Sequence, residues 1–287
     1  MHRRRIGADE VGAIGLGAMP LSIPGRPDEA HAVRTVHAAL DAGVTLLDTA
    51  DAYCLDASDF GHGEALLARA LRAWDGDRDA VVVATKGGHT RGEDGSWSLD
   101  GRPEHLRAAC EASLRRLGAE AIGLYQFHRP DPDVPFEESV GALRELVDAG
   151  KVRGAGLSNV SIEQIDAGRA ILGDALVAVQ NELSPRFRSS EPEVAHCAAH
   201  GIAFLPWSPF GGIAAAGELG GAHAAFAEVA RERGVSPQQI CLAWLLAKAP
   251  VVIPIPGSSR PETIRDSAAA ADLGLAPGEL ARLDAAS

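Results

Sequence analysis

The feature that most constrains the fold is a regular alternation between short apolar runs and longer stretches rich in Ala, Leu and Arg. The apolar runs have strand character and occur at residues 11–19, 44–48, 80–86, 122–128, 154–158, 175–180, 202–207 and 251–255. Helical stretches follow them, at residues 29–42, 64–74, 103–117, 136–149, 161 onward, 191–200, 222–233, 236–248 and 260–271, with a short one at the C-terminus. Strict alternation of this kind predicts a parallel sheet with helical crossovers.

Eight strand–helix repeats in 287 residues favour a closed barrel. No break in composition marks a boundary, so we expect one α/β domain over residues 1–287, a single (β/α)8 TIM barrel. The alternative is an open doubly wound sheet for dinucleotides, which requires G-x-G-x-x-G after the first strand. Residues 15–20 instead read Gly-Leu-Gly-Ala-Met-Pro, and Pro20 would disrupt the expected start of the helix.

Charge and cysteine content exclude several functional classes. A formal net charge of −12 argues against a nucleic-acid binder but leaves an anionic cofactor possible, because backbone amides can hold phosphate. No apolar run approaches the ~20 residues of a membrane span, and no apolar segment of a secretory signal follows the basic start. Four dispersed cysteines without a CxxC pair predict free thiols in a cytoplasmic protein, with no metal site: Cys54, Cys110, Cys197 and Cys241.

Polar residues stand where the predicted strands end. The second, third and fourth strands end in Asp48, Lys86 and His128, and Lys86 is one of only three lysines against 24 arginines. Later strands end in Ser158-Asn159, Gln180-Asn181 and Trp207-Ser208. Because the carboxyl ends of barrel strands converge on one face, where barrel enzymes place their active sites, we expect these side chains to meet there.

One tyrosine belongs to this set. Side-chain alternation places Gln126 and His128 on one face of their strand and Tyr125 on the other, towards the helices. That leaves Tyr53, five residues after Asp48, as the candidate phenol. A neighbouring ammonium lowers the pKa of a phenol from about 10, a carboxylate keeps a buried lysine charged, and an imidazole can orient a carbonyl. Taken singly, Asp48 could instead cap a turn and His128 could be a structural residue.

Motifs in a characteristic order add a family resemblance. They read LDTADAY at 47–53, GHGE at 61–64, ATKG at 84–87, LYQFHRPD at 124–131, GAGLSN at 154–159, VQNE at 179–182, WSP at 207–209 and IPIPGS at 253–258, after IGLG at 14–17. With these motifs the chain resembles the aldo-keto reductases over nearly its whole length. The resemblance implies a barrel oxidoreductase that reduces an aldehyde or ketone, a small-molecule carbonyl substrate, with NADP(H) as cofactor.

The resemblance also implies roles for individual positions. Tyr53 would donate the proton, Lys86 and Asp48 would tune it, and His128 would orient the carbonyl. Ser158, Asn159 and Gln180 would bind the nicotinamide carboxamide, and Trp207 would stack on the ring or, alternatively, be a core aromatic. Further cofactor contacts would come from Gly17, Ala18, Met19, Asp48, Ser208, Pro209, Phe210, Gly211, Gly257, Ser258, Ser259, Arg260, Asp266 and Ser267.

The phosphate side departs from the family pattern. Ser258 to Arg260 open a helix whose N-terminus attracts phosphate, and Arg260 offers a fork for the 2′-phosphate of NADPH or is simply an exposed arginine. Many family members carry Lys at Gly257, Glu-Asn at Asp266-Ser267 and Tyr at Leu183. These departures weaken the resemblance on the adenosine side. NADPH remains the preferred cofactor, and NADH is less firmly excluded.

Two other functions compete with a working reductase. One is a non-catalytic NADPH-binding sensor or scaffold subunit, and the other is a Schiff-base lyase that uses Lys86 as nucleophile. Asp48 should keep Lys86 charged, which ranks the lyase last. We expect a monomer or weak homo-oligomer with no nucleic-acid or membrane partner.

Overall fold

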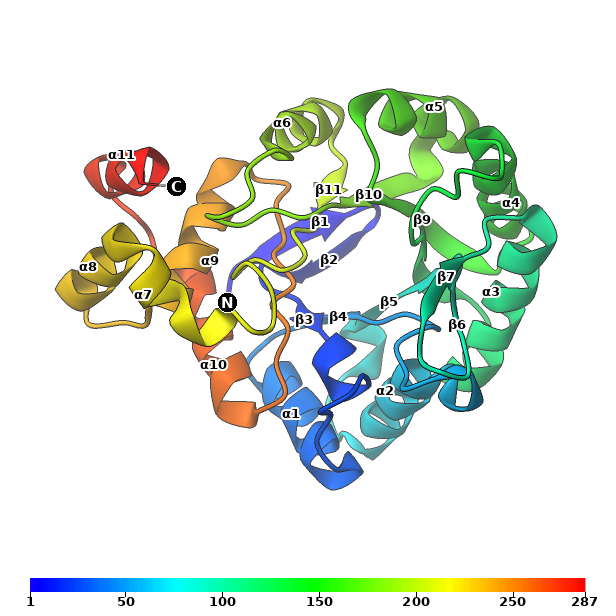
Figure 1. Ribbon diagram of the computed structural model, residues 1–287, viewed down its shortest axis with the longest axis horizontal. Coiled ribbons are helices and arrows are strands. Elements are labelled where there is room, and N and C mark those ends of the chain that lie inside the picture. The colour runs from blue at the N-terminus through cyan, green and yellow to red at the C-terminus, as the bar shows by residue number, and fades with distance from the viewer. Residues whose placement is uncertain (287) are drawn as a thin grey trace.

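The computed structural model of the protein describes residues 1–286. Seven parallel strands form one sheet in the order β11-β10-β9-β8-β5-β4-β3, which curls into a barrel (Figure 1). The strands are β3 (Leu16–Gly17), β4 (Leu46–Asp48), β5 (Val82–Gly87), β8 (Ile122–Phe127), β9 (Val152–Ser158), β10 (Leu176–Gln180) and β11 (Ala203–Phe204). The predicted (β/α)8 barrel is confirmed.

The eighth segment closes the barrel without forming a regular strand. Isolated parallel bridges pair Val252 with Phe204 and Gly257 with Gly17. The N–H of Gly17 donates to the carbonyl of Pro256 at 3.0 Å. Pro254 and Pro256 have no N–H to donate, so a continuous ladder cannot form. The strand predicted at 251–255 is thus reduced to a closing segment between β11 and β3.

The strand predicted at residues 11–19 is wrong. Its first part belongs to an antiparallel hairpin of β1 (Arg3–Ile6) and β2 (Asp9–Gly12), and its second part contributes the short strand β3. The hairpin turns at Gly7, whose φ of 60° suits glycine. Ile6 and Val11 join the apolar cluster inside the barrel, so the hairpin closes one end of it. The charged residues of β1 concealed this strand in the sequence.

Helices surround the strands (Figure 1). They are α1 (Glu29–Asp41), α2 (His62–Ala73), α3 (Pro103–Leu117), α4 (Phe136–Asp148), α5 (Ile162–Leu172), α6 (Glu191–His200), α7 (Leu219–Ala222), α8 (Ala224–Arg233), α9 (Pro237–Lys248), α10 (Pro261–Ala269) and α11 (Pro277–Ala285). The predicted capping box of Ser161 with Gln164 and the N-cap at Ser236 are confirmed. None of the helices within residues 1–286 is long and apolar enough to cross a membrane.

A hairpin that the sequence did not predict projects over the barrel. It consists of β6 (His89–Arg91) and β7 (Trp97–Leu99), which pair antiparallel. The hairpin lies beside the open end of the barrel in Figure 1. It therefore supplies a wall for whatever site the strand ends form.

Candidate active site

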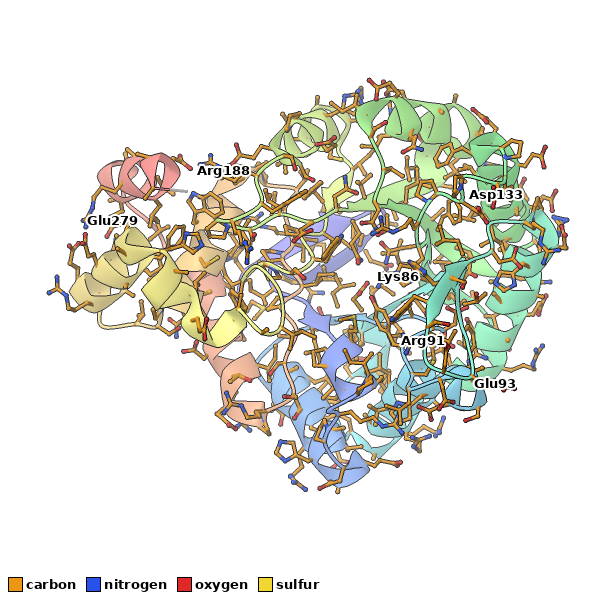
Figure 2. All side chains as sticks on the ribbon, viewed as in Figure 1. Lys86, Arg91, Glu93, Asp133, Arg188 and Glu279 are labelled. Atoms are coloured by element: carbon orange, nitrogen blue, oxygen red, sulfur yellow. The ribbon has the colours of Figure 1, made fainter. Side chains whose placement is uncertain are left out.

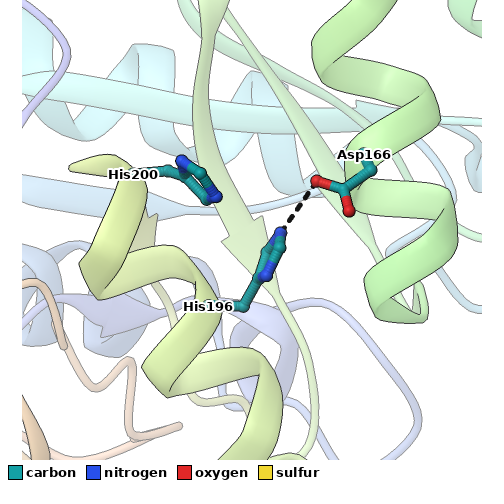
Figure 3. Close-up of side chains that lie close together, drawn as sticks. All are labelled: Asp166, His196 and His200. Atoms are coloured by element: carbon teal, nitrogen blue, oxygen red, sulfur yellow. Dashed lines mark hydrogen bonds and ion pairs between the residues drawn. The ribbon is translucent and has the colours of Figure 1, made fainter.

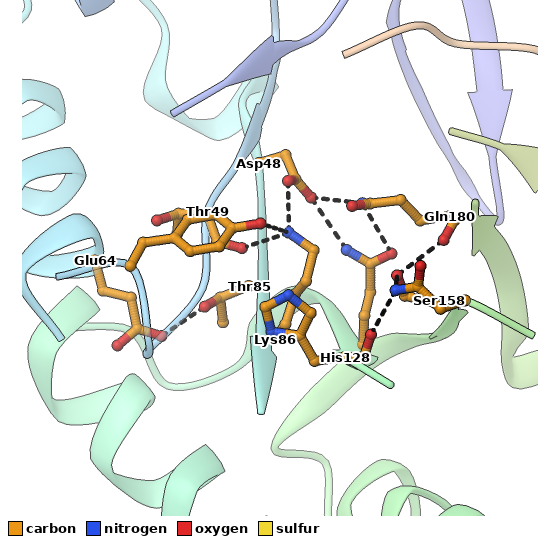
Figure 4. A network of polar contacts seen from close by, with 11 residues as sticks. Asp48, Thr49, Glu64, Thr85, Lys86, His128, Ser158 and Gln180 are labelled. Carbon is orange, nitrogen blue, oxygen red and sulfur yellow. Dashed lines mark hydrogen bonds and ion pairs between the residues drawn. The ribbon is translucent and has the colours of Figure 1, made fainter. Parts of the chain in front are cut away.

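Lys86 lies inside the barrel, where it is fully buried (Figure 2). Its ammonium donates to Asp48 Oδ1 at 2.6 Å, to the carbonyl oxygen of Thr49 at 2.8 Å and to the Tyr53 hydroxyl oxygen at 3.2 Å (Figure 4). An ammonium carries three protons, so all of its donors have partners. Three of the four residues predicted to be catalytic are thus hydrogen-bonded to one another.

Asp48 is held in place by two amides as well as by Lys86. Its Oδ2 accepts from the Gln180 side-chain nitrogen at 2.8 Å and from that of Gln126 at 3.1 Å. Gln126 was not among the predicted site residues, although strand alternation had already placed it on the face of His128. The Gln180 nitrogen is occupied by Asp48, so its amide oxygen is the atom that remains for a ligand.

The surroundings raise the pKa of both Lys86 and Tyr53. Burial alone lowers the pKa of Lys86, but the charges and hydrogen bonds of Asp48 and Tyr53 outweigh it and raise that pKa. Burial raises the pKa of Tyr53, and the opposing influence of Lys86 does not offset it. The expectation that Lys86 brings the Tyr53 pKa below its ordinary value is wrong for this state, because desolvation of the phenolate dominates.

His128 lies beside the phenol. Its ring centroid is 5.7 Å from that of Tyr53, and burial together with the charge of Lys86 places its pKa well below the ordinary value. The imidazole is therefore neutral at neutral pH. Its other neighbour is His89, at a centroid distance of 4.2 Å. His89 is fixed in turn by a 3.1 Å contact between its Nδ1 and the carbonyl of Ser98.

A second polar cluster contains Thr85, the neighbour of Lys86 on β5. The Thr85 hydroxyl donates to Glu64 at 2.6 Å, and Arg116 forms an ion pair with the other oxygen of Glu64. Glu64 is buried and belongs to α2, so this cluster links α2 and α3 to β5. Pairing by Arg116 lets a carboxylate occupy such a buried position.

The strand ends open into a cavity of about 580 Å³, a volume typical of small-molecule sites. Tyr53 and His128 lie at its base, and His89, Arg91 and Trp97 of the β6–β7 hairpin line one side. Trp97 meets the Tyr53 ring edge to face, at a centroid distance of 6.5 Å. The hairpin therefore forms one wall of the cavity. Arg129, next to His128, also lines the cavity and was not predicted.

The residues predicted to bind nicotinamide, Ser158, Asn159 and Gln180, also line this cavity. Asn159 donates through Nδ2 to the carbonyl of His128 and to Ser158 Oγ, both at 3.0 Å. The hydroxyl of Ser158 donates to the carbonyl of Gln180 at 2.8 Å. Asn159 and Ser208 are the only non-glycine residues with positive φ in the described chain, at 59° and 47°. Such conformations often occur at ligand sites.

Half of the remaining predicted cofactor positions line the same cavity. Those that line it are Gly17, Met19, Trp207, Ser208, Pro209, Phe210 and Gly257. Ala18 and Gly211 are sequence neighbours of lining residues but are not among them. The Nε1 of Trp207 is buried without a hydrogen-bond partner within residues 1–286.

The structure does not bring the predicted adenosine residues into this cavity. Ser258, Ser259 and Arg260 lie at the start of α10, where Ser258 Oγ accepts from the Arg260 N–H and Arg260 is exposed. Both carboxylate oxygens of Asp266 accept hydrogen bonds from the start of α9, from Ser236 Oγ and Gln239 Nε2, each at 2.6 Å. Ser267 is buried. Cofactor contacts by these residues remain predictions.

A parallel barrel with a Lys–Asp–Tyr unit and a histidine at its open end defines a class of oxidoreductase. The chain matches the Aldo/keto reductase family over residues 13–287 and belongs to that family.

Relatives and solved structures agree with this assignment. The chain is 37% identical to the 6-dehydroglucose reductase of Novosphingobium aromaticivorans, over 91% of this chain and 86% of the relative. It resembles the structure of the glycerol dehydrogenase from Gluconobacter oxydans, with a TM-score of 0.84, 29% identity and coverage of 99% and 94% of the two chains. It also resembles an aldo/keto reductase from Klebsiella pneumoniae in complex with NADP and acetate, with a TM-score of 0.80, 28% identity and coverage of 99% and 94%.

Proposed function

We propose that this protein reduces an aldehyde or ketone to the alcohol with NADPH as the reductant and Tyr53 as the proton donor. The observation that carries the proposal is the hydrogen-bonded unit of Tyr53, Lys86 and Asp48 at the base of a cavity. If the Lys86–Asp48 pair had only a structural role, it would not require a tyrosine hydroxyl beside it that faces a cavity. The position of Tyr53 therefore also favours an enzyme over a sensor or scaffold subunit.

The cavity suits a nicotinamide ring opposite the β6–β7 hairpin. Ser158, Asn159 and Gln180 would hold the carboxamide, with the Gln180 oxygen as the acceptor, and Trp207 would cover the ring. The positive φ of Asn159 and Ser208 fits a wall shaped around a ligand. The Klebsiella pneumoniae relative bound to NADP supports this choice of cofactor. When bound, the reduced cofactor supplies the hydride that the carbonyl carbon accepts.

The proton comes from this chain. Tyr53 donates its hydroxyl proton to the carbonyl oxygen of the substrate, and the neutral His128 orients that oxygen by a hydrogen bond. The adjacent Lys86 stabilises the phenolate that remains, which is a charge present only after the transfer begins. Asp48 keeps Lys86 charged and aimed at the phenol, which is why Gln126 and Gln180 fix Asp48 in turn.

A Tyr53→Phe variant tests the proposal. We expect turnover to fall by about 10²–10⁴-fold, the usual contribution of a general acid, while NADPH binding is retained. The measurement is steady-state NADPH oxidation against a panel of aldehydes and ketones, with NADPH binding followed by fluorescence. The matched control is Tyr125→Phe at the other tyrosine, whose hydroxyl donates to the Leu106 carbonyl at 3.3 Å beneath α3.

Two outcomes would reject the proposal. If Tyr53→Phe reduces a small aldehyde at the rate of the unaltered protein, the proton comes from another group. If the unaltered protein binds NADPH tightly but oxidises it with no carbonyl in the panel, the sensor function is favoured.

A further inference from the structure

A second group of ligand-type side chains lies on the outer helices (Figure 3). His196 and His200 are one turn apart on α6, and Asp166 faces them from α5. One ligand atom from each residue lies within 4.8 Å of the other two. We propose that these three residues bind Zn²⁺ or a chemically similar divalent transition-metal ion, which links α5 to α6.

The donor set has the chemistry of a zinc site. Imidazole and carboxylate are two of the ligand types that Zn²⁺ prefers, at about 2.0–2.2 Å. Two imidazoles and one carboxylate supply three ligands and leave the fourth position open to water. Residues four apart in a helix share one face, so both imidazoles reach the same point. Their ring centroids are 4.7 Å apart. His200 is exposed, so its ring is free to rotate the short distance that tetrahedral coordination requires.

The present hydrogen bond shows where the metal would enter. His196 Nε2 lies 2.9 Å from Asp166 Oδ1, with one proton between them. The metal ion takes the place of that proton, which moves to Nδ1 when the imidazole is neutral and to solvent when it is charged. Arg169 donates to the same oxygen at 3.1 Å, so the metal ion competes with one surface arginine for Asp166.

A hollow next to His200 places the three residues in the barrel. It has a volume of about 300 Å³ and is lined by His200, Arg169, Gly7 and Val177, among others, but not by Asp166 or His196. Val177 is at the amino end of β10, whereas Gln180 of the active site is at its carboxyl end. The proposed site therefore lies on the opposite end of the barrel from Tyr53. The prediction of no metal site considered only cysteine spacing and overlooked the two histidines.

Titration of the chelator-treated full-length protein with Zn²⁺, by calorimetry, tests the site. We expect one equivalent of Zn²⁺ to bind, and His200→Ala to weaken binding by at least about tenfold. The control is His105→Gln, because His105 Nδ1 lies 3.5 Å from Asp100 in a His–Asp pair without a second histidine. Titration with Co²⁺ adds a spectroscopic readout, since tetrahedral nitrogen and oxygen ligands give intense visible absorption bands.

The same samples give a stability readout. Zn²⁺ should raise the melting temperature of the unaltered protein and of His105→Gln but not that of His200→Ala. Carbonyl reduction should be equal in all three, so failure of the metal site is distinct from failure of the reductase function. Absence of saturable binding, or equal binding by His200→Ala, would overturn the proposal.

Discussion

Two adjacent layers inside the barrel are built from the same strands and differ completely in chemistry. One layer contains Leu46, Ala84, Leu124 and Ala178, which belong to one apolar cluster. The other lies two residues further along the same strands, on the same inward face, and contains Asp48, Lys86, Gln126 and Gln180. Both layers are buried. Equally buried positions can therefore hold either apolar side chains or charged and polar ones, provided that each polar group has a hydrogen-bond partner or counter-charge.

The polar layer is stable because its groups satisfy one another. Asp48 accepts from three side chains and Lys86 uses all three donors. If one partner is removed, the other is left buried without a hydrogen bond or counter-charge, which destabilises the folded protein. The apolar layer has no polar groups and so has no such penalty. The polar layer should therefore be the more fragile of the two, in both stability and function.

The largest effect should follow the loss of Lys86. We expect Lys86→Met to lower the free energy of unfolding by about 3–5 kcal/mol, because Asp48 is left buried without its cation. Carbonyl reduction should fall by at least about 10²-fold, since the phenolate of Tyr53 loses its stabilising charge. Chemical denaturation and NADPH oxidation measure the two effects.

Lys151→Met is the matched control. Lys151 forms an ion pair with Glu111 at the surface, where its side chain is 41% exposed. A surface pair of this kind contributes about 0–1 kcal/mol. Equal destabilisation by the two lysine substitutions would contradict the distinction between the buried and the surface pair.

A purely structural effect, without a loss of activity, should follow a change in the apolar layer. Leu124→Ala should lower the free energy of unfolding by about 2–5 kcal/mol, because it opens a cavity in a fully packed interior. The reduction rate per folded molecule should stay close to that of the unaltered protein, since Gln126 above it keeps its bond to Asp48. Loss of activity as large as in Lys86→Met, at full folding, would show that the two layers are coupled.

The sequence predicted the alternation of strands and helices because apolar periodicity determines which segments are buried. The prediction from the sequence was wrong where charged residues or prolines interrupted the apolar pattern. The charged strand β1 gave no apolar signal, and Pro254 and Pro256 reduced the eighth strand to isolated bridges. The capped helices α5 and α9 were predicted correctly at their starts because a cap is a local interaction.

The candidate site was predictable as far as strand ends determine it. Asp48 and Lys86 lie at the carboxyl ends of β4 and β5, and His128 directly follows β8, so topology alone brings them together. Arg129 was missed because its position depends on how the loop after β8 folds over the barrel. The Tyr53 pKa was misjudged because a sequence gives the sign of a neighbouring charge but not the depth of burial that opposes it.

The smallest expected effect is a flat pH profile of reduction at saturating NADPH. Burial raises the pKa of Tyr53 above its ordinary value of about 10, so the phenol keeps its proton between about pH 6 and 9. Burial lowers the pKa of His128 well below its ordinary value of about 6.5, so the imidazole stays neutral over the same range. The rate should therefore vary little there and fall only at higher pH, as Tyr53 loses its proton. A change in the reduction rate near pH 6–7 that disappears in His128→Gln would instead mean that His128 titrates in this range. The polar layer would then be more hydrated than its burial indicates.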